Sequence, residues 1–280
     1  MSLERISLDN VIKASAIANP KADCDYKKDG LLYCGKCNTP KQTRVNLCGI
    51  DQIVSCMCDC REAAYKATVQ AEDERQRKLK ICALRTSGLM DSSLRSVSFD
   101  KDDGRSKEYT DKGRRYVANW GTVERDNVGM LFWGSTGNGK TFVAACIANA
   151  LIDQGVSVMI TSFPRILSAL QGMYADDRAA YIDELKRYRL LILDDLGAER
   201  QSEYALEQVY SVIDARSNSG KPLIVTTNLP LTEIQKAKDM SYQRIYDRIL
   251  AMCVPVQFEG ESRRKGIAAE KMKAAKKIFE

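Results

Sequence analysis

"GMLFWGSTGNGKT", residues 129–141, joins a run of apolar residues to a glycine-rich loop that ends in lysine and threonine. The loop, residues 134–141, matches the pattern G-x-x-x-x-G-K-[ST] in full, and an amphipathic helical pattern follows it. Glycines let the backbone N–H groups of such a loop curve around phosphate oxygens, and the N-terminus of the next helix adds positive potential. The stretch therefore predicts a strand, a phosphate-binding loop and a helix, in that order.

This loop predicts the residues that bind ATP. We expect Lys140 to reach the β and γ phosphates and Thr141 to ligate Mg²⁺. The residues expected to bind the nucleotide and its metal are Gly134, Ser135, Thr136, Gly137, Asn138, Gly139, Lys140, Thr141 and, from a later strand, Asp194.

Two further apolar runs end in polar residues that suit the same site. "LLILDDLG", residues 190–197, ends in two carboxylates. Asp194 is expected to hold Mg²⁺ directly or through water, and Asp195 to orient and deprotonate the attacking water. "LIVTTNLP", residues 223–230, places Asn228 at the tip of a third buried strand. Alone, Asn228 would indicate a turn; beside the other motifs, it is expected to reach the γ-phosphate or the attacking water.

Strand-like apolar runs alternate with helical patterns through this part of the chain. Such alternation predicts an α/β fold in which helices cover both faces of a parallel five-stranded sheet. The expected strands are residues 129–133, 156–161, 190–193, 223–226 and 254–258, and the expected helices include 140–154, 163–174 and 203–217.

Cysteines are concentrated near the start of the chain, where seven of the ten precede residue 61, and histidine is absent from the sequence. A C-x-x-C pair is followed, after about twenty residues, by C-x-C-x-C, a separation typical of a structural zinc site. We expect Cys34, Cys37, Cys58 and Cys60 to bind zinc, with Cys56 as the alternate in the second group. Redox-active or free thiols are the competing interpretation.

The segment between the cysteine groups, residues 43–56, alternates around a Gly-Ile-Asp turn and predicts a short hairpin. Metal is expected to fold this module, because its residues are too few and too polar to build a core. The cysteines not expected to bind metal are Cys24 and Cys48, together with Cys82, Cys146 and Cys253, which are expected to be small buried apolar residues.

The totals place these motifs in a globular chain of 280 residues, with 44% hydrophobic and 29% charged residues and a net charge of +6. Its apolar runs are shorter than the roughly 20 residues of a membrane span. No secretory leader is recognisable, so we expect a reducing, cytoplasmic location and no membrane partner. Composition predicts a zinc-binding domain at residues 1–85, a Ser-, Gly- and Asp-rich linker at 86–100, and an ATPase domain at 101–280.

The three motifs, residues 134–141, 190–199 and 223–230, precede "RIYDRIL", residues 244–250, and "GESRRKG", residues 260–266. In this order they resemble the AAA+ ATPases of the DnaC/DnaI helicase-loader group, and the likeness covers nearly the whole chain. The cysteine segment looks like the zinc-binding N-terminal part of DnaI-like and phage-type members. The resemblance implies an AAA+ P-loop fold without a helical lid, which loaders of this group also lack.

The resemblance implies roles for two arginines. Arg248 matches the arginine finger of the group, which is supplied in trans to the ATP of a neighbouring subunit. Arg264 matches the arginine of the second sensor region, although Arg263 beside it is an open alternative. The positions that match the ATP site of the group are Lys140, Thr141, Asp194, Asp195 and Asn228.

The function implied by the resemblance is a Mg²⁺-dependent ATPase, stimulated by assembly and DNA, that places a replicative DnaB-type helicase on single-stranded DNA. Residues 1–85 would contact the helicase, and the AAA+ part would self-assemble and grip DNA, with ATP, Mg²⁺ and Zn²⁺ as cofactors. One alternative is a transposition helper ATPase of the IstB type, which acts on duplex DNA; the cysteine module argues against it. Another is a non-enzymatic adaptor, which an intact set of Lys140, Asp194 and Asp195 argues against.

Overall fold

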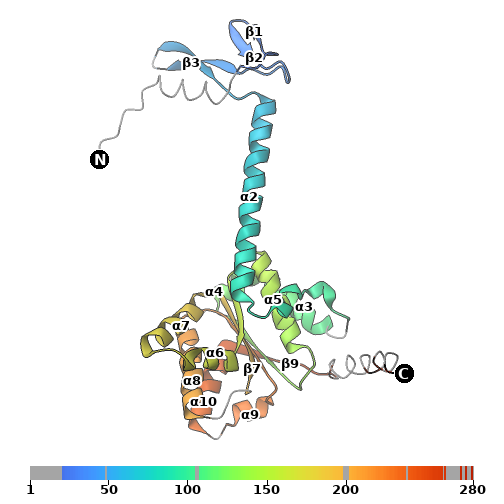
Figure 1. The fold of residues 1–280 in the computed structure, drawn as a ribbon, viewed down its shortest axis with the longest axis vertical. Coiled ribbons are helices and arrows are strands. Elements are labelled where there is room, and N and C mark those ends of the chain that lie inside the picture. Colours follow the sequence, from blue (N-terminus) through green and yellow to red (C-terminus); the bar gives the residue numbers. More distant parts are fainter. Residues whose placement is uncertain are drawn as a thin grey trace. The chain divides into compact units, whose positions relative to one another are not determined.

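The computed structural model of the chain describes residues 21–47, 49–104, 107–197, 202–237, 239–260 and 262, and the single positions 272, 275 and 279. The chain divides into two compact units, Met1–Lys78 and Leu79–Glu280. Each unit has its own architecture. Figure 1 labels the elements of both.

The first unit contains two antiparallel hairpins. Strands β1 (Tyr26–Lys28) and β2 (Leu31–Tyr33) are joined by Asp29 and Gly30, whose φ angles of 53° and 75° suit a tight two-residue turn. Strands β3 (Gln42–Leu47) and β4 (Ile50–Ser55) form the second hairpin, so the hairpin predicted between the cysteine groups is confirmed.

Helix α2 (Asp59–Gly88) follows the second hairpin and crosses the division between the units. Its apolar positions are sparse, so nearly all of its side chains up to Lys80 are exposed, as is Cys82, which we expected to be buried. Near its end, Ile81 and Leu84 pack against the core of the second unit. A Cβ atom at Gly88 would lie 1.9 Å from the carbonyl oxygen of Val158, so the helix approaches the sheet where only glycine fits.

The second unit is built on a parallel sheet of five strands in the order β6-β7-β8-β5-β9, which confirms the predicted fold class. The strands lie within a few residues of their expected positions. Their bounds are β5 (Gly129–Trp133), β6 (Val158–Ser162), β7 (Leu190–Leu196), β8 (Leu223–Thr227) and β9 (Cys253–Gln257).

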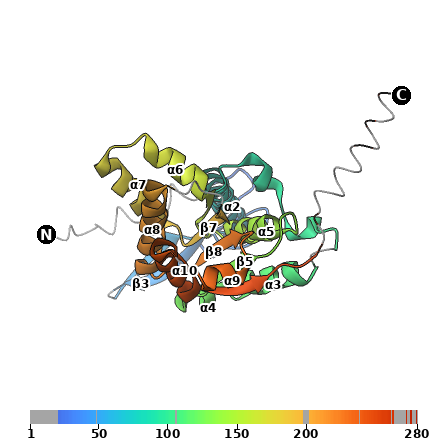
Figure 2. The same ribbon diagram turned by 90° about the horizontal axis from the view of Figure 1, so that it is seen from below.

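Helices cover both faces of this sheet (Figure 2). Alternate strand residues point to opposite faces, so Leu190 and Ile192 join the core beneath α5, whereas Leu191 and Leu193 join the core beneath α8. Because both faces are covered, the strands are apolar almost throughout. The helices are α3 (Lys107–Ala118), α4 (Trp120–Arg125) and α5 (Lys140–Asp153) on the first side, α6 (Phe163–Gln171), α7 (Ala175–Arg187), α8 (Glu203–Asn218) and α10 (Met240–Met252) on the second, and the short α9 (Leu231–Gln235) before α10.

The segment expected to be a linker, residues 86–100, instead belongs to the second unit. Leu89 is fully buried and forms an isolated parallel bridge with Ile160 of β6. The segment contains two short 3₁₀ helices, η1 (Ser92–Ser96) and η2 (Phe99–Lys101). Asp91, one of the polar residues that suggested a linker, instead caps η1, because its side chain accepts a hydrogen bond from the backbone N–H of Ser93. The compact unit therefore starts at Leu79 rather than at residue 101.

No helix in the described ranges is both long enough and apolar enough to cross a membrane.

Leu89→Ala is expected to destabilise the second unit by about 2–5 kcal/mol, because it removes a fully buried side chain from a packed core. The matched control is Met90→Ala, since Met90 is 50% exposed and its loss should change stability by no more than about 0.5 kcal/mol. Denaturant unfolding of the full chain measures both. Equal stability of the two variants would contradict the packing of Leu89 in the core and would favour a linker at residues 86–100.

Candidate functional site

The phosphate-binding loop joins the end of β5 to the first residue of α5. Gly137 and Gly139 have φ angles of 89° and 95°, a region that residues with a Cβ atom rarely adopt. Gly139 is also the N-cap of α5, so the loop closes directly onto the N-terminus of a buried helix. The local sequence thus produces the phosphate-binding geometry that its pattern predicts.

Lys140 is 5% exposed, and oxygen atoms surround its ammonium group. Its Nζ atom donates to the carbonyl oxygens of Gly134 and Ser135, both at 2.8 Å, and to Asn228 Oδ1 at 2.9 Å. It also lies 3.2 Å from Asn138 Oδ1. The structure therefore brings together the lysine of the loop and the asparagine at the tip of β8, which are 88 residues apart in the sequence.

Asp194 lies at the centre of the polar group beside this lysine. The Thr141 hydroxyl donates to Asp194 Oδ1 and Oδ2 at 2.9 and 3.1 Å, and the Thr226 hydroxyl donates to Oδ1 at 2.6 Å. Burial raises the pKa of the Asp194 carboxyl above its ordinary value, and the negative charge of Asp195 adds to this. The two threonine hydroxyls and the charge of Lys140 act in the opposite direction.

Asp195 follows at an irregularity in strand β7. The pairing of β7 with β8 shifts register between Leu193 and Leu196, and Asp195 has a φ of 57°. Its backbone N–H donates to Thr226 Oγ1 at 3.0 Å. Irregularities of this kind redirect side chains, and here Asp195 lines the cavity in front of the loop, as expected of a water-positioning carboxylate.

The cavity in front of the loop has a volume of about 230 Å³. Among the described residues that line it, Lys140 is the cation and Asp195 is the carboxylate. Phe142 also lines the cavity, although sequence analysis did not select it; its position directly after the Lys-Thr pair was the available signal. The lining residues are Thr136, Gly137, Gly139, Lys140, Thr141, Phe142, Asp195 and Asn228.

Asn138, expected to bind nucleotide, is not among the residues that line this cavity. Asn138 Nδ2 donates to the carbonyl oxygen of Phe258 at 2.6 Å, and Asn138 is 4% exposed. Phe258 follows β9 and stacks on Tyr109 of α3, with ring centroids 4.1 Å apart. A Cβ atom at Gly134 would lie 2.2 Å from the same carbonyl oxygen. The loop is therefore held against the end of β9, a contact that a local motif does not reveal.

The arginines expected from the resemblance lie apart from the cavity or outside the described residues. Arg248, on α10, does not line the cavity: its Nε donates to Asp214 Oδ1 at 2.8 Å, and its guanidinium lies 4.7 Å from the Tyr210 ring centroid. Both contacts are to residues of α8 in the same chain. Arg263 and Arg264 are outside the residues that the structure describes.

This arrangement can bind a magnesium nucleotide. The Thr141 hydroxyl and the Asp194 carboxylate are oxygen ligands, the type that Mg²⁺ prefers, and the ammonium group of Lys140 is next to them. The loop supplies N–H groups for phosphate, and Asp195 offers an acceptor for a water molecule. The set therefore fits Mg²⁺ and a nucleoside triphosphate.

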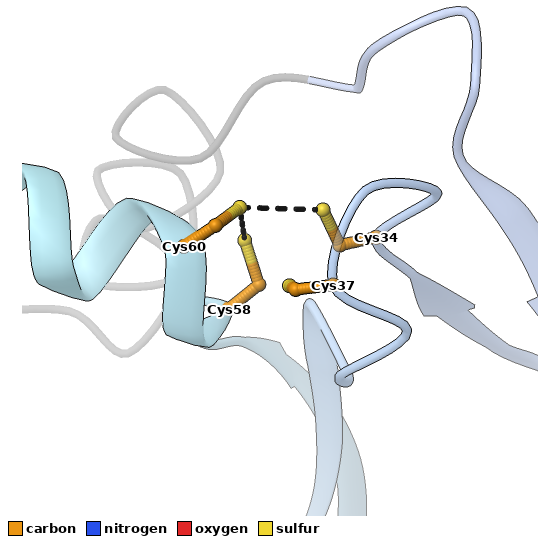
Figure 3. A group of neighbouring side chains, drawn as sticks. All are labelled: Cys34, Cys37, Cys58 and Cys60. Carbon is orange, nitrogen blue, oxygen red and sulfur yellow. Dashed lines mark hydrogen bonds between the residues drawn. The ribbon is translucent and has the colours of Figure 1, made fainter.

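In the first unit, the Sγ atoms of the four expected cysteines all lie within 4.8 Å of one another (Figure 3). Cys34 and Cys37 come from the loop between β2 and β3, and Cys58 and Cys60 from the start of α2. The Cys60 sulfur is 3.6 Å from that of Cys34 and 3.5 Å from that of Cys58. Four sulfurs around zinc at about 2.3 Å would be roughly 3.8 Å apart, so the group fits a tetrahedral ion.

Cys24 and Cys56, which lie near this group in the described part of the chain, do not belong to it. The thiol of Cys56 donates to the carbonyl oxygen of Pro40 at 3.4 Å, and Cys24 is exposed. Cys48 lies outside the described residues.

Hydrogen bonds shift the pKa values of thiols in the four-cysteine group. The hydrogen bond from the Thr39 hydroxyl, with N–H groups of Cys60 and Thr39, lowers the pKa of the Cys37 thiol to about 6. The surroundings of Cys37 therefore favour its thiolate, the form of cysteine that binds metal, whereas hydrogen bonds with Cys58, Cys37 and Cys34 raise the pKa of the Cys60 thiol to about 12.

Comparisons with known proteins connect these sites to a family. A profile described as IstB-like ATP binding protein matches residues 73–271 of this chain. Over 163 residues the chain is 28% identical to the replicative helicase loader DnaC of Escherichia coli (strain K12), covering 57% of this chain and 64% of that protein. Over 147 residues it is 28% identical to the replicative helicase loader DnaI of Bacillus subtilis (strain 168), covering 49% and 47%.

A third relative has a different name. A putative ATP-binding protein in an insertion sequence of Mycobacterium tuberculosis is 34% identical over 100 residues, which are 35% of this chain and 40% of that protein. Each of these three matches thus spans less than two thirds of the relative's own length.

Solved structures share the fold. The crystal structure of DnaI aligns with a TM-score of 0.52 and 24% identity, covering 61% of this chain and 96% of that one. The crystal structure of the DnaC helicase loader aligns with a TM-score of 0.51 and 22% identity, covering 60% and 100%. The second unit therefore has the AAA+ fold of these proteins.

Asp194→Asn is expected to stabilise the folded protein at neutral pH. Because the folded state binds the Asp194 proton more tightly than the unfolded chain does, the stability that this group contributes is present below the ordinary aspartate pKa and is lost as pH rises through the raised value. Each unit by which folding raises the pKa of Asp194 corresponds to about 1.4 kcal/mol of unfolding free energy. The difference in unfolding free energy between variant and wild type should therefore grow with pH across this window and then level off.

Denaturant unfolding at a series of pH values measures this difference. Asp176→Asn, which removes an exposed carboxylate of α7, is the control for the loss of one negative charge. A difference for Asp194→Asn that is constant with pH, or that shrinks as pH rises, would contradict the assignment of Asp194 as a partly buried carboxylate held at an energetic cost.

Proposed function

Since the chain belongs to the family of IstB-like ATP-binding proteins, we propose that it is an AAA+ ATPase that loads a replicative DnaB-type helicase onto single-stranded DNA. The observation that carries the proposal is the group formed by Thr141, Asp194 and Thr226 beside Lys140, which suits a magnesium nucleotide. The loader role is supported by relatives named replicative helicase loader DnaC and DnaI.

ATP hydrolysis would use the residues of this group in distinct ways. Lys140 would bind the β and γ phosphates, and Thr141 and Asp194 would hold Mg²⁺, which neutralises phosphate charge when bound. Asp195 would accept a proton from the attacking water. Asn228, already within hydrogen-bond distance of Lys140, would contact the γ-phosphate or that water. Asp195 lies at the irregularity in β7 and lines the cavity.

A transposition helper that acts on duplex DNA is the second candidate. It is favoured by the description of the matching family and by the relative from an insertion sequence. The cysteine group of the first unit favours the loader, because the resemblance to DnaI-like and phage-type loaders includes a zinc-binding N-terminal part.

ATP turnover and helicase binding separate the candidates. The full chain is expected to hydrolyse ATP, to be stimulated more by single-stranded than by duplex DNA, and to co-purify with the replicative helicase of the same cell. Lys140→Ala is the control, because it removes the phosphate-binding cation and should abolish turnover. Stimulation by duplex DNA with sequence preference, and no helicase binding, would favour the transposition helper. Absence of turnover under all these conditions would favour a non-enzymatic adaptor.

The four-cysteine group is proposed to bind one structural zinc ion per chain. Zinc contributes roughly 10–16 kcal/mol of apparent binding free energy in small modules, so its removal should unfold the first unit. Cys34→Ser or Cys37→Ser is expected to lose the metal while the second unit stays folded. Cys56→Ser is the matched control and should keep it, because the Cys56 thiol faces Pro40 instead. Metal analysis of gently purified protein measures the stoichiometry.

Two results would contradict the zinc assignment. If protein purified without chelators contains no zinc, the four-cysteine group is not a zinc site. Loss of zinc in Cys56→Ser, with retention in Cys60→Ser, would replace Cys60 by Cys56 as the fourth ligand.

Arg248 is proposed to act on the ATP of a neighbouring subunit. In its own chain it is held by Asp214 through Nε, which leaves other N–H groups of the guanidinium for a second partner. Arg248→Ala should bind ATP normally and hydrolyse it slowly, because such arginines contribute about 10³–10⁵ in rate. Mixing it with Lys140→Ala protein should restore some turnover, since mixed interfaces pair an intact loop with an intact arginine.

The control for this experiment is Arg244→Ala, which removes an exposed arginine one turn earlier on α10. The trans role of Arg248 is excluded if the mixture is as inactive as each variant alone while both variants still assemble.

A further inference from the structure

A buried ion pair lies in the same small unit as the four-cysteine group. Lys41 Nζ is 2.6 Å from Asp25 Oδ2, and the two side chains are 6% and 0% exposed. The ion pair of Lys66 and Glu62 on α2, by contrast, keeps 66% and 48% of its side chains exposed. Burying two charges is expensive even when they pair, so stability alone is a weak reason for this arrangement.

Asp25 is bound to the loop that carries the first cysteine pair. Its Oδ1 accepts the backbone N–H of Gly35 at 3.3 Å, and its Oδ2 accepts the N–H of Ala22 at 2.7 Å. Gly35 stands between Cys34 and Cys37. A Cβ atom at Gly35 would lie 1.9 Å from the carbonyl oxygen of Cys24, so the segment before Asp25 covers this loop closely. Asp25 therefore holds the backbone of the first pair.

Lys41 is bound to the segment that leads into the second cysteine pair. The N–H of Cys56, two residues before Cys58, donates to the carbonyl oxygen of Lys41 at 2.8 Å. The N–H of Lys41 in turn donates to the carbonyl oxygen of Leu32 in β2 at 2.7 Å. The Lys41 backbone therefore fixes the approach to the second pair, while its side chain reaches the residue that fixes the first.

We propose that Asp25 and Lys41 form a clamp that positions the two cysteine pairs for their metal ion. The inference rests on the proposed zinc site and adds two positioning residues that do not touch the metal. Without the ion pair, the two backbone segments lose their direct side-chain link. Part of the free energy of metal binding must then be used to bring the four sulfurs together, so the affinity for the metal falls. Partners of this kind typically change metal affinity by about 10–100-fold.

Cobalt titration of the metal-free full chain tests the clamp, because four-thiolate cobalt has a characteristic absorption spectrum that reports both affinity and ligand set. Lys41→Met and Asp25→Asn should each weaken cobalt binding by about 10–100-fold, with the four-thiolate spectrum unchanged at saturation. The double variant should be no weaker than the single ones, because the two residues act as a unit. Lys41→Arg, which keeps the ion pair, should bind within a few-fold of wild type, about the scatter of uncoupled changes.

The matched control is Lys36→Met. Lys36 lies between Cys34 and Cys37, so the change removes a positive charge beside the same sulfurs, but its side chain is exposed. It should bind cobalt as wild type does. This control separates the loss of a clamp from the loss of positive charge near the thiolates.

The outcomes are distinct. A wild-type chain that gives no four-thiolate cobalt spectrum and contains no zinc would refute the zinc site itself. If the wild type binds cobalt and Lys41→Met binds it with the same affinity, the clamp is refuted and the zinc site is not. Weak binding in Lys41→Met with normal binding in Asp25→Asn would also refute the clamp, since the charge of Lys41 would then suffice. If Lys41→Met does not fold, tight binding by Lys41→Arg and weak binding by Asp25→Asn still support the clamp, and equal affinities of these two refute it.

Discussion

The carboxylate of Asp194 accepts hydrogen bonds from Thr141 at the start of α5 and from Thr226 on β8, and thereby joins three elements at one edge of the sheet. The site depends on this contact. Thr226 also accepts the backbone N–H of Asp195, so one hydroxyl holds the side chain of Asp194 and the backbone of Asp195. Holding the Asp194 charge in a partly buried position is unfavourable, as the raised pKa of this group indicates. A divalent cation beside the two oxygen ligands would offset that cost.

The phosphate-binding loop is positioned by a second constraint, on its opposite side. Asn138 bonds to the carbonyl oxygen of Phe258, and Phe258 is stacked on Tyr109 of α3. Lys140 in turn contacts both Asn138 and Asn228. The lysine therefore lies between the tip of β8 and the segment that leaves β9. Any contact that draws Lys140 toward phosphate therefore acts on both Asn138 and Asn228.

Local patterns predicted the parts of the site that are local in origin. The loop, the carboxylates that end β7 and the cysteine pairs follow from spacing over a few residues, and the structure brings Cys34, Cys37, Cys58 and Cys60 together. Long-range contacts were not predictable in this way. The linker interpretation of residues 86–100 was wrong because Asp91 caps a short helix there, while Leu89 pairs with Ile160 of β6 and is buried in the core. The hydrogen bond from the Asn138 amide to Phe258 could not be predicted from the motif, because the two residues are 120 positions apart.

The most direct test of the Mg²⁺-ATP site is the effect of Thr226→Val on the magnesium dependence of ATP affinity. Valine keeps the β-branched shape that suits a buried strand but removes the hydroxyl that aligns Asp194 and Asp195. The predicted result is that Mg²⁺ tightens ATP binding in the wild type, that Thr226→Val loses most of this gain, and that the two bind ATP equally without Mg²⁺. An undiminished gain from Mg²⁺ in Thr226→Val would contradict the central role of this contact.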